Sequence, residues 1–296
     1  MFVTLVAVVL ALVLGHVAPA LVASLRRHGW FGQWLAWLDA RSAEGGFWRG
    51  RYGIALALAP LLLVALAQWG LHAPWMGLLG FLFSVAALLY AWGPRDLDVD
   101  VEAVMDAQDA AARRDAVARL WPSDDAPNED GPALVEAVFV GALRRWFGVL
   151  FWFVLLGPFG ALLFRFADLA CTAEFVSRLP PATAAGARDL RALLAWPVAQ
   201  LMTWSMALVG NFDVVWQAWR GAHGAELQLD AGFLGAAARA SVKSELAEET
   251  ADYVAEGLVP QLREMPELRD AMSLVWRILL LWLAVMAVFV IAGWVS

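Results

Sequence analysis

The sequence predicts an all-α, polytopic helical membrane protein with about five or six spans and two helical cytoplasmic insertions. Composition is the first reason, because 61% of the residues are hydrophobic, 17% are charged and the mean hydropathy is +0.64. The second is the segment Trp146–Phe164, which carries no charge and is flanked by arginines on both sides. A run of this length fits the hydrocarbon core of a bilayer, and a soluble domain is excluded.

Five apolar segments are predicted to span the membrane in chain order: Phe2–Leu25, Gly53–Leu71, Pro74–Trp92, Trp146–Arg165 and Leu274–Val295. The first has no basic residue before it and Arg26 and Arg27 after it, so we interpret it as a retained anchor and not as a cleaved signal peptide. A sixth segment, Leu190–Asn211, is weaker because it contains polar residues and Pro197. It would cross the membrane, lie in the interface or re-enter.

The arginines orient the spans. They concentrate in the connections 26–52 and 93–145, so the positive-inside rule places these connections and 212–273 in the cytoplasm and both termini in the periplasm. Arg178 and Arg188 would lie outside, against the rule. The predicted location is the bacterial inner (plasma) membrane, multi-pass, with the lipid bilayer as a partner.

Five regions follow from these boundaries: 1–92 with three spans, 93–145 acidic and helical, 146–211 with a broken span and a weaker one, 212–273 acidic and helical, and 274–296 with the last span. Residues 93–145 hold 6 arginines against 12 acids, and residues 213–273 hold 5 basic residues against 11 acids. This negative charge disfavours a nucleic-acid partner.

A single cysteine, Cys171, excludes an intrachain disulfide.

Each insertion is predicted to form one amphipathic helix, at Val99–Leu120 and Gly235–Leu258. The acids Asp96, Asp98, Asp100 and Glu102 would hold Mg²⁺ if a phosphate supplied further ligands. The alternative, which we favour, is an acidic first turn that complements a helix N-terminus.

Little catalytic chemistry is indicated. The chain has no GxxxxGK[ST] motif, and its four histidines lack zinc-ligand spacing. No catalytic residue, metal or cofactor is therefore predicted. The segment Gly157-Pro158-Phe159-Gly160 is expected either to break the fourth span and line a cavity, or only to bend it and allow close packing.

Three segments resemble the AmpE family of bacterial inner-membrane proteins: GPRDLDVDVEAV at 93–104, RRWFGVLFWFVLLGPFGALLFR at 144–165 and WPVAQLMTWSMALVGNFDVVWQAWR at 196–220. The resemblance implies a role in β-lactamase induction and peptidoglycan recycling, with an AmpD-like amidase or a muropeptide as partner. AmpE is in turn similar to the cobinamide-phosphate synthases CbiB and CobD, which use ATP and Mg²⁺ to join an amino-propanol group to a corrinoid carboxylate.

The core motif of those enzymes lies without a gap on Ala133–Arg165. Glu136, Leu150-Phe151-Trp152, Gly160-Ala161-Leu162-Leu163 and Arg165 match it, whereas Val140, Gly141, Arg144 and Arg145 stand where the enzymes have Glu, Asn, Asp and Gly. Losing these acids removes candidate oxygen ligands for Mg²⁺. The sequence therefore favours a non-enzymatic signalling or scaffold protein over an ATP-dependent ligase, and gives a transporter less support.

Six residues are predicted to bind a ligand: Arg95, Asp96, Asp98, Glu136, Arg165 and Asp168. Three of them, Glu136, Arg165 and Asp168, are expected to face the interior near one polar cavity, because unpaired charges in lipid are unfavourable by roughly 2.5–3.5 kcal/mol at mid-span. In a ligase, Glu136 would act with Asp96 and Asp98.

Overall fold

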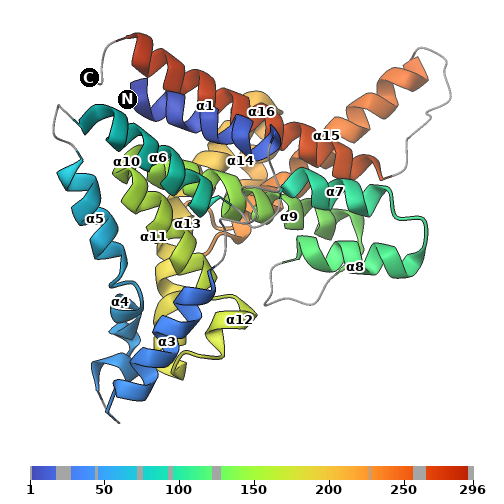
Figure 1. Ribbon diagram of the computed structural model, residues 1–296. Coiled ribbons are helices and arrows are strands. Elements are labelled where there is room, and N and C mark those ends of the chain that lie inside the picture. The colour runs from blue at the N-terminus through green and yellow to red at the C-terminus, as the bar shows by residue number, and fades with distance from the viewer. Residues whose placement is uncertain are drawn as a thin grey trace. The chain divides into compact units, whose positions relative to one another are not determined.

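A computed structural model describes residues 2–17, 28–43, 46–71, 76–92, 96–121, 128–226, 228–255 and 265–292. These residues form helices, turns and loops and contain no strand, which confirms the all-α prediction (Figure 1). The chain divides into two compact units, which are described separately. Unit 1 comprises 1–94, 146–194 and 285–296, and unit 2 comprises 95–145 and 195–284.

Unit 1 is built around α6 and the adjacent helices α10 and α11. α6 packs against α1 and α11, and α11 also contacts α5. Its helices are α1 (Phe2–Val17), α3 (Gly29–Arg41), α4 (Ile54–Ala57), α5 (Leu61–Gly70), α6 (Gly77–Ala91), α10 (Gly148–Leu156), α11 (Pro158–Leu169), α12 (Ala173–Val176) and the first part of α13 (Pro181–Val209), with the short 3-10 turns η1 (Phe47–Arg49) and η2 (Arg51–Gly53) before α4.

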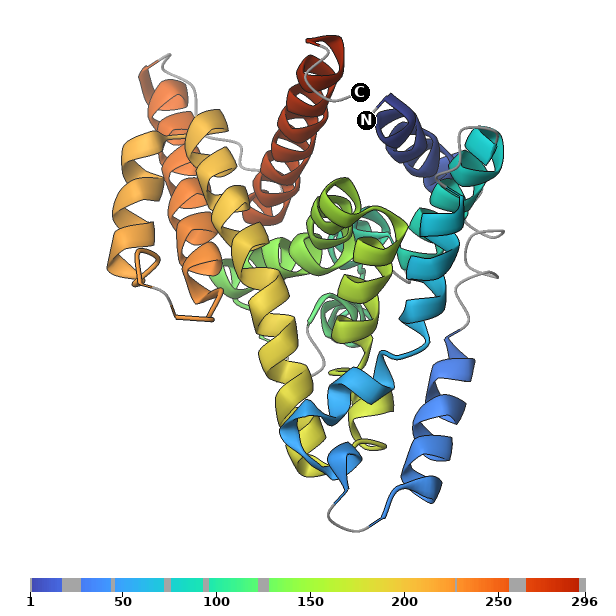
Figure 2. The ribbon, with the colours of Figure 1, turned by 90° about the vertical axis from the view of Figure 1, so that its left-hand side faces the viewer.

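Unit 2 is centred on α15, which packs against α9 and α14, while α8 contacts α7 and α9. Its helices are α7 (Leu97–Met105), α8 (Ala110–Leu120), α9 (Gly131–Ala142), the second part of α13, α14 (Phe212–Gly221), α15 (Gly232–Ala255) and most of α16 (Pro266–Ile291); the other view of the ribbon is in Figure 2. A π-helical turn, Leu143–Phe147, joins α9 to α10. The predicted helix at Gly235–Leu258 corresponds to α15.

Local chemistry explains several helix boundaries. Proline is the first residue of α11, α13 and α16, where its missing N–H needs no partner. Asp109 accepts a hydrogen bond of 2.6 Å from the Ala112 N–H and so begins α8. Residues 106–109 therefore interrupt the insertion, and the prediction of one helix over Val99–Leu120 is wrong: α7 and α8 are separate.

Three helices in the described ranges are long and apolar enough to cross a membrane: Gly131–Leu156, α13 and α16. A fourth span results if the pair Arg51–Ala57 and α5, bent by 51°, is counted as one. The helix α6 has only 15 residues, and residues 18–25 of the predicted first span lie outside the description. The membrane class is consistent with these helices, while the count of five or six spans stays a prediction, as does the orientation.

The predicted span Trp146–Arg165 is not one helix. Gly157 has φ 69° and ψ −155°, a conformation that only glycine adopts readily, and it separates α10 from α11. A methyl group added at Gly148 would lie 2.1 Å from the ring of Phe164, and one at Gly160 would lie 2.2 Å from the Trp152 carbonyl oxygen. The second helix therefore folds back along the first as a hairpin, and the expected break is confirmed.

A side chain from α5 meets the backbone groups that the break exposes. The Gln68 amide nitrogen donates to the Leu156 carbonyl at 3.0 Å, and the Phe159 N–H donates to the Gln68 amide oxygen at 2.9 Å. In hydrocarbon such groups must be satisfied by protein. One glutamine therefore supports both ends of the hairpin turn, and no pattern in the sequence predicts this contact.

Candidate functional site

The predicted site residue Arg165 is buried in unit 1 together with Asp168. Their relative exposures are 2% and 4%, and Arg165 Nη1 lies 3.5 Å from Asp168 Oδ2. Arg165 Nε also donates a 2.6 Å hydrogen bond to the Ala91 carbonyl, at the end of α6. A cation at a helix C-terminus is favourable. Two of the three charged side chains expected to face the protein interior are thus buried in protein, whereas the third, Glu136, is 39% exposed. Arg165 links α11 to α6.

Unit 2 contains a second ion pair that the sequence did not predict, between the buried Asp100 and the partly buried Arg145. Asp100 is 1% exposed, and Arg145 Nη1 donates to its Oδ2 at 2.6 Å. Arg145 Nη2 donates to the Arg119 carbonyl, the next-to-last residue of α8, at 3.0 Å. Arg145 thus connects the π-helical turn to α7 and α8. Both residues are charged, but nothing in their spacing in the sequence indicates that they pair.

Glu136 on α9 is paired with Arg239 on α15, and both side chains are 39% exposed. Gly235, one turn earlier on α15, leaves room for this carboxylate, since an added methyl group would lie 2.6 Å from Glu136 Cδ. The helix α15 therefore provides both the space and the cation for Glu136.

The acidic run at the start of α7 has the geometry of a helix beginning. Asp96 occupies the N-cap position, and Asp98 and Asp100 lie in the first turn. Asp98 accepts a 3.2 Å hydrogen bond from the Trp276 indole N–H on α16. Arg95 lies outside the described residues.

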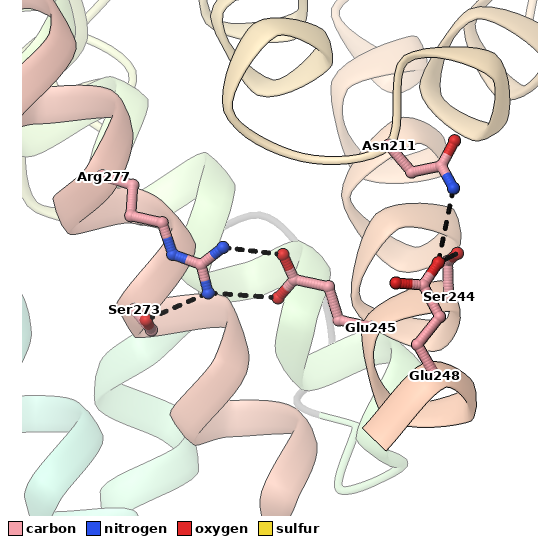
Figure 3. Close-up of polar contacts among 6 residues, drawn as sticks. All are labelled: Asn211, Ser244, Glu245, Glu248, Ser273 and Arg277. Carbon is pink, nitrogen blue, oxygen red and sulfur yellow. Dashed lines mark hydrogen bonds and ion pairs between the residues drawn. The ribbon is translucent and has the colours of Figure 1, made fainter. Parts of the chain in front are cut away.

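A further carboxylate of unit 2, Glu245, is also paired with an arginine. Figure 3 shows Glu245 of α15 facing Arg277 of α16, with Nη1 and Nη2 donating to its two oxygens at 2.8 and 3.4 Å. Arg277 also contacts the Ser273 hydroxyl at 3.3 Å. On the other side of α15, Glu248 accepts from Asn211 at 3.4 Å and from Ser244 at 3.3 Å.

In these contacts arginines balance the charge of single carboxylates, and the carboxylates are not grouped with one another. Within the described residues no three His, Cys, Asp or Glu side chains are grouped so that they could hold a metal ion. Of the predicted site residues, Arg165 and Asp168 belong to unit 1, and Asp96, Asp98 and Glu136 to unit 2. Their ligand-binding role and the proposed single polar cavity stay predictions.

One comparison with known proteins supports part of the predicted resemblance. Cobalamin biosynthesis protein CobD of Chromobacterium violaceum is 34% identical over 126 residues, which is 40% of this chain and 39% of that protein. The chain thus spans about two fifths of the length of this curated relative. No family model and no solved structure matches the chain. The similarity and the apolar helices indicate a membrane protein distantly related to CobD, while the AmpE assignment stays a prediction.

Proposed function

We propose that this chain is a non-enzymatic membrane protein that uses a CobD-like framework for signalling or scaffolding. The observation that carries the proposal is the pairing of Glu136 with Arg239 and of Asp100 with Arg145. Magnesium bound to ATP takes one or two carboxylate ligands in addition to the phosphates and water. An ion-paired carboxylate must first give up its arginine, and a buried one resists this strongly.

The setting we propose is β-lactamase induction and peptidoglycan recycling in the bacterial inner membrane. Its support is the resemblance of segments 93–104, 144–165 and 196–220 to the AmpE family. The partner in this setting is an AmpD-like amidase or a muropeptide. Loss of the chain is expected to change the level of β-lactamase that a β-lactam induces, and the wild-type gene is expected to restore it.

An ATP-dependent ligase is the second candidate, because the curated relative is a cobalamin biosynthesis protein and 34% identity extends over 126 residues. In this case Glu136 would exchange Arg239 for the Mg²⁺ of Mg-ATP, with Asp96 and Asp98 supplying further oxygen ligands.

Titration of the purified protein in detergent with Mg-ATP, followed by calorimetry, separates the two candidates. A scaffold is expected to give no saturable heat in the wild type. Saturable binding that disappears in Glu136→Gln and Asp96→Asn, but persists in the matched control Glu226→Gln, would overturn the proposal in favour of the ligase. Glu226 is a suitable control because it is an exposed acid that contacts only nearby polar groups such as His223.

A further inference from the structure

Unit 1 contains a cavity at the hairpin turn between α10 and α11. Its volume is about 610 Å³, and it lies between that turn and the helices α5 and α6. This is four times the roughly 150 Å³ of an apolar cavity that binds benzene, and it falls within the range of about 300–1,000 Å³ for ligand sites. The cavity has room for a substantial organic group.

The described side chains that line it are apolar except for Gln68 and Ser84, and none of them is ionisable, although the lining also exposes polar atoms; the residues that define it best are Gln68, Phe81, Phe83, Ser84, Phe153 and Gly157. Its two polar side chains are already engaged. Gln68 holds both ends of the hairpin turn, and the Ser84 hydroxyl donates to the Gly80 carbonyl at 2.8 Å. A phosphate or a nucleotide would lose its hydration here without meeting a charged side chain among the described lining residues, so these side chains favour a hydrocarbon chain over an anionic ligand.

The cavity opens on an apolar surface. Leu155 lines it and is 60% exposed, and Leu78 and Leu82 on the adjoining helix α6 are 72% and 53% exposed. In a chain with membrane-spanning helices such a surface faces acyl chains. A hydrocarbon chain can therefore enter the cavity directly from the bilayer.

From these observations we propose that the cavity beside Gly157 binds one hydrocarbon chain of a lipid. Phe81, Phe83 and Phe153 surround the chain, and the Gln68 contacts keep the hairpin open around it. The chain comes either from a phospholipid or from a polyisoprenyl lipid, which share this chemistry. The site is independent of the proposed signalling role, since it uses neither the arginines nor the carboxylates described above.

The test is photolabelling of the full-length protein in nanodiscs of phosphatidylethanolamine and phosphatidylglycerol. A phosphatidylethanolamine with a diazirine near the end of one acyl chain is the probe, and labelled peptides are mapped by mass spectrometry. We expect saturable labelling of α6 and α10. The variant Ser84→Trp, which fills the cavity, should reduce this labelling at least fivefold.

Two controls keep the result interpretable. Leu82→Trp adds the same ring two residues away on the exposed side of α6 and should label as the wild type does, and Ser84→Ala, which leaves the cavity open, should do the same. Competition with an unlabelled polyprenol, compared with unlabelled phosphatidylglycerol, identifies the source of the chain. Labelling of the wild type that does not saturate, or that is equal in Ser84→Trp and Leu82→Trp, would overturn the proposal, whatever the nucleotide titration gives.

Discussion

The two units place their polar side chains differently. In unit 1 Arg165 pairs with Asp168, and polar side chains also bind backbone groups at helix ends: Gln68 supports both ends of the hairpin turn, and Arg165 donates to the last carbonyl of α6. In unit 2 arginines pair with carboxylates, at Asp100, Glu136 and Glu245. The cavity of unit 1 lies beside the turn that Gln68 supports, whereas in unit 2 the charges of three carboxylates are balanced by arginines.

This difference indicates where each kind of ligand can bind. The chemistry of an ATP-dependent ligase needs free oxygens, and in unit 2 three of its carboxylates are committed to arginines. A hydrocarbon chain needs only space and apolar walls, which unit 1 provides. The substitutions below measure how much each polar contact contributes to the free energy of unfolding, from the largest expected effect to the smallest.

Asp168→Ala in unit 1 and Asp100→Ala in unit 2 should have the largest effects, because each removes a buried carboxylate from its arginine, which is buried in the case of Arg165 and partly buried in the case of Arg145. We expect the free energy of unfolding to fall by about 3–5 kcal/mol in each variant. Thermal unfolding in detergent checks this. Restoration by the apolar double variant Arg165→Met with Asp168→Leu is the control, and an unchanged midpoint for Asp168→Ala would show that its pair is dispensable.

Gln68→Leu should come next. It removes both hydrogen bonds to the hairpin turn, and the loss should be about 2–3 kcal/mol because the backbone at Leu156 and Phe159 has no water to replace them in a bilayer. Gln68→Met, which keeps the length of the side chain and neither hydrogen bond, is the matched control and should lower the midpoint as Gln68→Leu does. Equal stability of Gln68→Leu and the wild type would mean that the turn does not need this side chain.

Gly157→Ala should destabilise by about 1–3 kcal/mol, since φ 69° with ψ −155° is unfavourable for any residue with a Cβ atom. An added methyl group would also meet the Gln68 amide at 2.8 Å. The neighbouring variant Pro158→Ala is the matched control and should change the free energy of unfolding by less than about 1 kcal/mol. Pro158 is the first residue of α11, a position at which a backbone N–H has no partner within the helix. Similar midpoints for the two variants would contradict this assignment of the break to Gly157.

The helical class and the position of the break were predictable, because they depend on composition and on Gly157-Pro158-Phe159-Gly160. The hairpin that α10 and α11 form was not predictable. A hydrophobic run of 19 residues can form one span or a hairpin. In this chain the hairpin turn is supported by Gln68, which lies 89 residues before Gly157 in the sequence.

The candidate site was predictable only in part. Burial of Arg165 and Asp168 follows from the unfavourable energy of charges in lipid. The partners Arg145 and Arg239 could not be found from spacing, since Asp100 and Arg145 are 45 residues apart and Glu136 and Arg239 are 103 apart. Ion pairs of this separation are set by helix packing.

The smallest effect is expected for Glu136→Gln in unit 2. Glu136 and Arg239 are each 39% exposed, and partly exposed ion pairs contribute about 0–1 kcal/mol because solvent and salt screen them. Arg239→Gln should have a similarly small effect, and raising the salt concentration should reduce both. Thermal unfolding of the two single variants and the double variant measures the coupling between them. A coupling energy well above 1 kcal/mol would mean that this pair holds α9 and α15 together as firmly as Arg165 holds α11 to α6. The backbone contacts of Gln68 and Arg165 in unit 1 and the ion pairs of unit 2 would then differ in the group that is bound and not in the strength of the contact.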